Sequence, residues 1–407
     1  MGEVLSPIME TAFAFATQAV HAGEHAPKPD FTPVNTPIYQ TVSFVYDSLE
    51  TMDAIFGGER QGYVYTRYGN PTVAALERAV ATLEGGETAV AFASGMAAIH
   101  ATLLALEVGS GAAVVSAQDA YGATSALLTT IFARQGVHVR LVDMADVDEV
   151  ESAIRELHPK AVLAEMISNP LLKVVDLAQV AALAHAHGAM MVVDSTFTSP
   201  YLLQPLRYGA DIVIHSTTKC LGGHGDVTGG IVVAPAAFRP KLELVGRLVG
   251  GILSPQEAYL TLRGLKTLPL RMRQQCQNAM AIAQWLADQP RIRKVFYPGL
   301  AHHPGHDIAR RLLREGGFGS VLAFELVDGD REQVFAFLNG LQLCLLATTL
   351  GDIYTELLYP TISSHRMLTP EQRSAVGISD ALIRLSAGIE DAADLIDDLD
   401  QALRKVS

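Results

Sequence analysis

The sequence contains little cysteine, tryptophan or charge. It has three cysteines and one tryptophan in 407 residues, and 18% of its residues are charged. Cys220, Cys276 and Cys344 lie too far apart for a disulfide framework or a zinc-ligand spacing, which favours a reducing cytoplasm. The chain has 43 acidic and 30 basic side chains, so its formal charge is −13. We therefore do not expect nucleic acid or an anionic membrane surface as a partner.

Long hydrophobic stretches are also scarce. The longest uncharged run covers residues 88–106 and is nominally long enough to span a bilayer. It is interrupted by Ser94-Gly95 and carries His100, so we expect a buried strand, a turn and a helix instead of a membrane span. The first twenty residues contain two glutamates and no basic cluster, and we therefore expect no secretory signal.

Several common ligand motifs are missing from the sequence. No Gly-x-Gly-x-x-Gly pattern follows a predicted strand and no Gly-Lys-Ser/Thr loop is present, which excludes dinucleotide-binding and P-loop folds. His302-His303 and His306 have a faint metal-ligand appearance. Because Pro304-Gly305 places them in a loop, we interpret them as structural or solvated residues and predict no metal site.

What the sequence does contain is a regular alternation of strand and helix patterns. The strands are apolar throughout, which is typical of a mostly parallel sheet covered by helices on both faces. Helical patterns begin before the first strand, at Pro71, and between later strands, at Met96, Asp146 and Leu177. Seven strands are predicted, over Ala89–Ala93, Ala112–Ala117, His138–Val142, Ala161–Met166, Met190–Asp194, Ile212–Ile214 and Ile231–Val233.

A second, smaller α/β unit follows a long helix predicted over Gln256–Leu286. Its strand patterns are Lys294–Tyr297, Val321–Leu326, Cys344–Thr348 and Ile383–Ser386, and a final helix begins at Asp391. We therefore expect an N-terminal arm over residues 1–63, a large domain over 64–257 and a small C-terminal domain over 258–407. The arm is irregular in pattern and is expected to pack on a neighbouring subunit.

Polar residues follow three of the predicted strands. Ser94-Gly95-Met96 opens a helix and offers backbone N–H groups to a phosphate. Asp194 ends another strand, and Lys219 follows Ser216-Thr217-Thr218 after a third. Each has an ordinary explanation as a turn, a helix cap or a solvated lysine. Together they match pyridoxal phosphate, whose aldehyde reacts with a lysine amine, whose ring nitrogen needs a carboxylate and whose phosphate needs donors.

The chain also resembles the trans-sulfuration (Cys/Met metabolism) family of fold-type I pyridoxal-phosphate enzymes, over about residues 15–405. The resemblance is carried by five motifs in the same order: Tyr65-Thr66-Arg67-Tyr68-Gly69-Asn70-Pro71-Thr72, Ala93-Ser94-Gly95-Met96-Ala97, Val193-Asp194-Ser195-Thr196-Phe197, His215-Ser216-Thr217-Thr218-Lys219 and Arg384-Leu385-Ser386-Ala387-Gly388-Ile389-Glu390-Asp391.

This resemblance implies pyridoxal 5'-phosphate as the cofactor and a role for each matching residue. Lys219, Asp194 and Tyr121 would be catalytic: the lysine that carries the cofactor, the partner of its ring nitrogen and the tyrosine stacked on its ring. Further cofactor-binding residues would be Tyr65, Arg67, Gly95, Met96, Ser216 and Thr218. Substrate-binding residues would be Arg384, Asn169, Thr355 and Tyr65. Since Tyr65 and Arg67 reach a neighbour's cofactor phosphate in the family, the active site would need a homodimer, and a homotetramer is expected.

The activity implied is γ-elimination of cystathionine, methionine or homocysteine-type substrates to a 2-oxoacid, ammonia and a thiol. Ser254-Pro255 and Leu350-Gly351-Asp352 are similar to methionine γ-lyases, whereas Ala123 and Tyr354 depart from the family's usual residues. Two alternatives stay open: γ-replacement, as in O-acylhomoserine sulfhydrylase or cystathionine γ-synthase, and a non-catalytic binding homologue.

Overall fold

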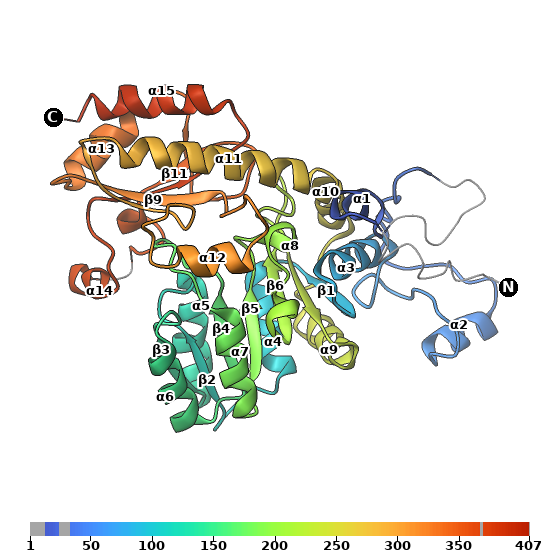
Figure 1. Ribbon diagram of the computed structural model, residues 1–407. Helices are drawn as coiled ribbons and strands as arrows, with labels where there is room; N and C mark the ends of the chain where they lie inside the picture. Colours follow the sequence, from blue (N-terminus) through green and yellow to red (C-terminus); the bar gives the residue numbers. More distant parts are fainter. Residues whose placement is uncertain (1–12, 24–32, 367–368, 407) are drawn as a thin grey trace.

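The computed structural model describes residues 13–23, 33–366 and 369–406, and it contains two sheets (Figure 1). Those parts of the predicted arm that cover residues 1–12 and 24–32 lie outside the described residues. The predicted boundaries at 63/64 and 257/258 stay predictions, and the second falls inside helix α10 (Pro255–Leu265).

The large sheet has seven strands, as predicted, in the order β1-β7-β6-β5-β4-β2-β3. Four of its six pairings are parallel, and only the two that involve β7 are antiparallel. Its strands are β1 (Thr88–Phe92), β2 (Ala113–Ala117), β3 (His138–Val142), β4 (Ala161–Glu165), β5 (Met190–Asp194), β6 (Ile212–Ser216) and β7 (Gly230–Ala234).

Helices on both faces bury this sheet, which explains why most of its strands are apolar throughout. The prediction is wrong for the edge strand β3, which carries the exposed residues His138 and Arg140. Asn70 caps the first long helix by accepting a hydrogen bond from Thr72 N, Pro71 occupies its first turn, and Gly85 ends it in the left-handed conformation with φ = 70°. The helices of this part are α3 (Pro71–Glu84), α4 (Gly95–Ala105), α5 (Gly122–Ala126), α6 (Val147–Leu157), α7 (Leu177–Ala186), α8 (Ser199–Leu202) and α9 (Arg239–Val249).

The long uncharged run folds as predicted. Residues 88–92 form β1, Ser94 is the turn residue that caps α4, and α4 continues to Ala105. Within the described residues, no helix combines the length and apolar character needed to cross a membrane.

The small sheet has five strands in the order β10-β11-β12-β9-β8, one more than the sequence predicted. The additional strand, β11 (Glu356–Leu358), pairs with its neighbour β12 in antiparallel fashion and with β10 in parallel. The other four are β8 (Ile292–Phe296), β9 (Val321–Leu326), β10 (Leu345–Leu346) and β12 (Leu382–Ser386). The helices of this part are α11 (Leu268–Ala287), α12 (His306–Leu312), α13 (Arg331–Gly340), α14 (Pro370–Ala375) and α15 (Ala392–Leu403).

Two helix predictions need correction. The helix predicted over Gln256–Leu286 is divided at Thr267 into α10 and α11, because Pro269 in the first turn of α11 lacks the N–H donor that a continuous helix would require.

The N-terminal arm was expected to be irregular, but it contains α1 (Phe15–His21) and α2 (Leu49–Phe56). Helix α1 packs against α3 and α11 of the same chain.

Candidate active site

The predicted site residues of the large sheet lie along one of its edges. Asp194 at the end of β5 pairs in register with Ile214 of β6, and Ser216 at the end of β6 pairs with Gly230 at the start of β7. Gly230 also pairs with Phe92 at the end of β1, directly before the α4 turn. The carboxyl ends of β1, β5 and β6 therefore meet at this edge, where ligands of open α/β sheets bind.

A phosphate-sized cradle forms where α4 approaches β6. The Ser94 hydroxyl accepts a hydrogen bond from Ala97 N, which leaves the Gly95 and Met96 amides in the first turn, where N–H groups have no intrahelical acceptor. A Cβ on Gly95 would lie 3.0 Å from Ser216 Cβ, a tight contact that glycine avoids. The hydroxyls of Ser216 and Thr218 lie beside the Gly229 carbonyl, at 3.5 and 3.4 Å.

Asp194 has a second carboxylate beside it. Glu165 at the end of β4 pairs with Asp194 in register, and its Oε1 accepts a hydrogen bond of 2.7 Å from Tyr121 N. Burial and the charge of Asp194 raise the pKa of Glu165 well above its ordinary value. Burial also raises the pKa of Asp194, but hydrogen bonds from Thr196 oppose this, including Thr196 N to Oδ1 at 3.0 Å. The negative charge of the pair therefore resides on Asp194.

Lys219 follows β6, and its amine is partly enclosed. Its Nζ donates a hydrogen bond of 2.8 Å to Thr349 Oγ1, a residue 130 positions away. Burial lowers the pKa of Lys219, and the nearby positive charge of Arg384 lowers it further. A lowered pKa leaves more of the amine neutral at neutral pH, which is the form that acts as a nucleophile or base.

Arg384 lies on β12 of the small sheet, and its guanidinium lies in the same site. Its Nη2 donates to the Thr349 carbonyl at 2.8 Å, and its Nη1 donates to Asn169 Oδ1 at 3.4 Å. The side chain is 3% exposed, and burial lowers its pKa to about 10. Thr349 thus joins Lys219 to Arg384, and the structure brings the predicted Lys219, Asn169 and Arg384 together.

Tyr121 lies before α5 and half of it is exposed. Its amide is fixed by Glu165, and its phenol is close enough to Arg384 to affect the pKa of that guanidinium. Tyr354, which departs from the family pattern, is 50% exposed, and Ala123 lies in α5 beside Tyr121.

Thr355 lies in a different environment from the other predicted substrate residues. Its hydroxyl donates to Glu390 Oε2 at 2.8 Å and accepts from Gly388 N at 2.9 Å, and the residue is fully buried. Its side chain therefore fastens the loop before β11 to the segment after β12.

Tyr65 and Arg67 lie in the segment before α3. Arg67 Nη1 donates to the Arg247 carbonyl on α9 at 2.6 Å, and its guanidinium lies 5.1 Å from the Tyr68 ring centroid. Tyr65 is 40% exposed, whereas Arg67 is half-buried.

The loop histidines have structural partners. His303 Nδ1 accepts from Gly305 N at 3.1 Å, whereas His306 Nδ1 is bonded to the Pro298 carbonyl at 2.8 Å. Residues 13–23, 33–366 and 369–406 contain no group of three or more His, Cys, Asp or Glu side chains arranged to hold a metal.

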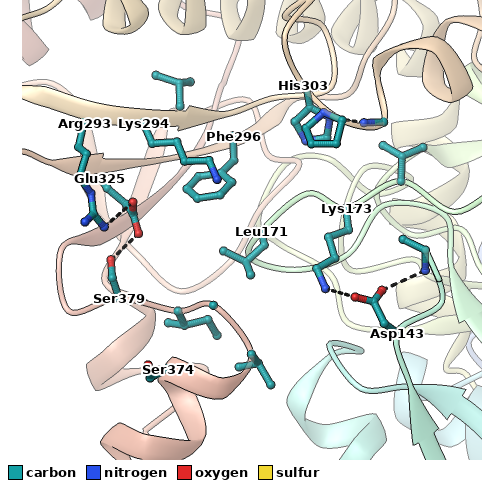
Figure 2. A pocket seen from close by; sticks show the side chains of 18 of the residues that line it. Asp143, Leu171, Lys173, Arg293, Lys294, Phe296, His303, Glu325, Ser374 and Ser379 are labelled. Atoms are coloured by element: carbon teal, nitrogen blue, oxygen red, sulfur yellow. Dashed lines mark hydrogen bonds and ion pairs between the residues drawn. The ribbon is translucent and has the colours of Figure 1, made fainter. Parts of the chain in front are cut away.

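A cavity of about 1340 Å³ lies near these histidines and contains none of the predicted site residues (Figure 2). Four of its charged side chains form ion pairs: Lys173 with Asp143 at 2.5 Å and Arg293 with Glu325 at 2.7 Å. A further cation, Lys294, has its Nζ 4.4 Å from the Phe296 ring centroid, and the cavity as a whole is a large space between the two sheets.

Sequence reasoning missed three residues of the site: Thr349, Glu165 and Glu356. Thr349 gives no motif, because its role depends on contacts with β12 and with the segment after β6. Glu165 could have been found, since it ends a predicted strand next to the one that ends at Asp194. Glu356 lies on the strand that was not predicted.

The residues present fit pyridoxal phosphate. A Cβ on Gly95 would crowd Ser216 at the start of α4, the pKa of Glu165 is raised more strongly than that of Asp194, and Lys219 has a lowered pKa at the same edge. These are a phosphate site, a carboxylate for a ring nitrogen and an amine for an aldehyde.

Comparison with known proteins gives the same answer. A family model described as Cys/Met metabolism PLP-dependent enzyme matches residues 16–404. An L-methionine gamma-lyase of Fusobacterium nucleatum subsp. polymorphum is 42% identical over 402 residues, covering 98% of this chain and 100% of the relative. A cystathionine gamma-lyase of Bacillus subtilis is 42% identical over 374 residues, covering 92% and 95%.

The solved structures that resemble this chain belong to the same group. A cystathionine gamma synthase from Xanthomonas oryzae pv. oryzae in complex with cystathionine superimposes with a TM-score of 0.90 at 40% identity, covering 97% of this chain and 99% of that one. A cystathionine gamma-lyase from Lactobacillus plantarum gives a TM-score of 0.89 at 36% identity, with the same coverage. With a matching family model over almost its whole length, this chain belongs to the Cys/Met metabolism family of pyridoxal-phosphate-dependent enzymes, and it has their fold type I architecture.

Proposed function

We propose that this enzyme catalyses γ-elimination on sulfur-containing amino acids, releasing a 2-oxoacid, ammonia and a thiol. The observation that carries the proposal is Thr349, which binds Lys219 through its hydroxyl and Arg384 through its carbonyl. The lysine that would carry the cofactor aldehyde and an arginine suited to bind a carboxylate therefore flank one residue. This arrangement matches an α-amino acid, whose amine would react with the aldehyde and whose carboxylate would bind the arginine. Relatives named methionine gamma-lyase and cystathionine gamma-lyase support elimination.

The residues of the site divide the work between binding and proton transfer. When bound, pyridoxal phosphate would supply an electron sink for negative charge at the substrate's α and β carbons. The Arg384 guanidinium holds the substrate carboxylate in bidentate fashion, and Asn169 fixes the guanidinium. The neutral Lys219 amine then removes the α proton and a β proton.

The remaining groups hold the reacting parts in place. Donors at Gly95, Met96, Ser216 and Thr218 bind the phosphate, and the charge of Asp194 keeps the ring nitrogen protonated. Tyr121, held by Glu165, would stack on the ring and assist proton transfer at the leaving group.

A second candidate is γ-replacement, in which a thiol attacks the γ carbon instead of the intermediate collapsing to a 2-oxoacid. The likeness to a cystathionine gamma synthase at a TM-score of 0.90 supports it. Both reactions use the same residues up to the loss of the γ-substituent. They differ in what happens to the substrate fragment that remains after this loss.

A substrate panel tests the proposal. The purified holoenzyme is incubated with cystathionine, methionine, homocysteine and an O-acylhomoserine, with and without added sulfide or cysteine. We expect 2-oxoacid to form from at least one sulfur substrate without any added thiol. Negligible oxoacid together with rapid formation of a new thioether would contradict elimination and support replacement.

We also propose a cytoplasmic homodimer, assembled further into a homotetramer, whose two active sites each use residues of both subunits. The exposed side chain of Tyr65 supports the shared site, and the half-buried Arg67 lies beside it, with its guanidinium 5.6 Å from the Tyr65 ring centroid. The three free, buried cysteines are compatible with a reducing compartment.

Mixing two inactive variants tests the shared site. Arg67→Ala should weaken cofactor retention by about 10- to 100-fold, the effect of losing a charge-assisted hydrogen bond. When it is mixed with Lys219→Ala, half of the randomly assembled dimers contain one intact site of two, so activity should recover to about a quarter of the wild-type value. Each variant alone is the control, and no recovery after verified subunit exchange would contradict the proposal.

A further inference from the structure

A buried glutamate lies on the same face of the small sheet as Arg384. Glu356 on β11 is opposite Ser386 of β12, and Leu358 is opposite Arg384. Because directly opposed residues share a face and side chains alternate along a strand, Glu356 and Arg384 are diagonal neighbours on one face. Glu356 is 5% exposed, so its carboxylate is removed from bulk water.

The two side chains present complementary atoms without partners. Within the described part of the chain, neither Glu356 Oε2 nor Arg384 Nε forms a hydrogen bond, and both atoms are buried. A buried acceptor or donor without a hydrogen-bond partner lowers the stability of the folded protein. The charge of Glu356 also raises the pKa of Arg384 against the effect of burial, so the two groups interact electrostatically.

Other charged groups surround this pair. Asp352, in the loop before β11, faces Glu356, as does Lys219 after β6. Tyr121 and His365 interact electrostatically with Arg384, and Arg271 and His224 lower the pKa of Asp352. Burial lowers the pKa of His365 to about 4, which leaves it neutral near pH 7.

Protonation of Glu356 therefore falls in the neutral range. Burial and the charge of Asp352 raise its pKa to about 7, against the opposing effects of Lys219 and Arg384. A second carboxylate brought to Arg384 would add another negative charge nearby and raise that pKa further.

We propose that Glu356 is a positioning residue that serves as the resident counter-ion of Arg384, and that a substrate carboxylate replaces it there as Glu356 takes up a proton from solvent. The inference rests on the proposed role of Arg384 as the carboxylate clamp. Substrate affinity is then coupled to the protonation of Glu356. Below neutral pH the uncharged Glu356 leaves Arg384 to the substrate, and above neutral pH the ionised Glu356 competes with it.

The test uses the holoenzyme and butyrate, a carboxylate that has no amine and stays ionised throughout the range examined. Its dissociation constant is measured by ligand-observed NMR, alongside the KM of the best substrate. For the wild type, both constants should rise roughly tenfold between about pH 7 and pH 8.5 because one proton is linked to binding. In Glu356→Gln, which mimics the protonated side chain, both should be low and independent of pH, with kcat changing less than KM.

Three further variants complete the test. Glu356→Asp retains a carboxylate and should restore the pH dependence. Glu325→Gln removes another buried carboxylate of the same sheet, one paired with Arg293, and should leave the wild-type profile unchanged. Arg384→Gln should abolish butyrate binding at every pH.

The outcomes separate the inference from the proposed function. If Arg384→Gln still binds butyrate as the wild type does, the clamp itself is wrong. If Arg384→Gln loses binding but Glu356→Gln keeps the wild-type pH profile, or binds butyrate more weakly at all pH values, the clamp stands and the role of Glu356 is overturned.

Discussion

Replacement of Lys219 with alanine is expected to abolish turnover, with kcat falling by at least about 10⁴-fold. Loss of general acid–base catalysis alone removes about 10²–10⁴-fold, and loss of the covalent bond to the cofactor adds to this. The variant should also lack the visible absorption band of lysine-bound pyridoxal phosphate. Stopped-flow rates and an absorption spectrum after addition of the cofactor measure both effects.

Lys173→Ala is the matched control, because Lys173 is a partly buried lysine paired with Asp143 outside the site. It should retain the absorption band and the wild-type rate. A Lys219→Ala enzyme that kept both would show that another amine does the chemistry. A wild-type protein that never acquired the band would instead support the non-catalytic homologue.

Truncation of Arg384 to alanine should lower kcat/KM by about 10²–10³-fold, mainly through KM. Removal of one member of a buried, hydrogen-bonded charge pair costs about 2–5 kcal/mol, and tenfold corresponds to about 1.4 kcal/mol. The cofactor is held by the large sheet, so its absorption band should survive. Steady-state kinetics together with the spectrum make this measurement.

Arg384→Lys refines the result, because lysine keeps the charge but loses the planar fork that binds a carboxylate in bidentate fashion. It should recover only part of the loss. Arg293→Ala, which removes an exposed arginine paired with Glu325, should leave kcat/KM unchanged. An Arg384→Ala enzyme with unaltered KM and reduced kcat would place Arg384 in the chemical step instead of in substrate binding.

The large sheet could be predicted from the sequence because all of its strands except the edge strand β3 are buried on both faces and carry mostly apolar residues. Strand β11 could not be predicted in the same way. It has three residues, begins with Glu356, and exists through its pairing with β12, which is distant in sequence. The single long helix was a misreading for a local reason: Pro269 divides it, and the apolar spacing on either side concealed the break.

The cofactor side of the site was predictable for a related reason. Asp194 and Lys219 directly follow predicted strands, and the ends of parallel strands meet at one edge. Thr349 and Glu356 have no such rule. Both lie near Arg384 in the later part of the chain, and they meet Lys219 only after the small sheet has packed against the large one. Their roles depend on long-range contacts that no local pattern records.

The cofactor and the substrate carboxylate are served by separate lengths of chain. The groups of one chain assigned to the phosphate and ring nitrogen of its own cofactor lie in the large-sheet part, between Gly95 and Lys219, whereas Arg384 and Glu356 belong to the small sheet. Amino-acid preference is therefore free to diverge in the later segment while the earlier one keeps the same chemistry. Because of this arrangement, chimaeric enzymes could combine the large-sheet segment of one family member with the small-sheet segment of another in order to change substrate preference.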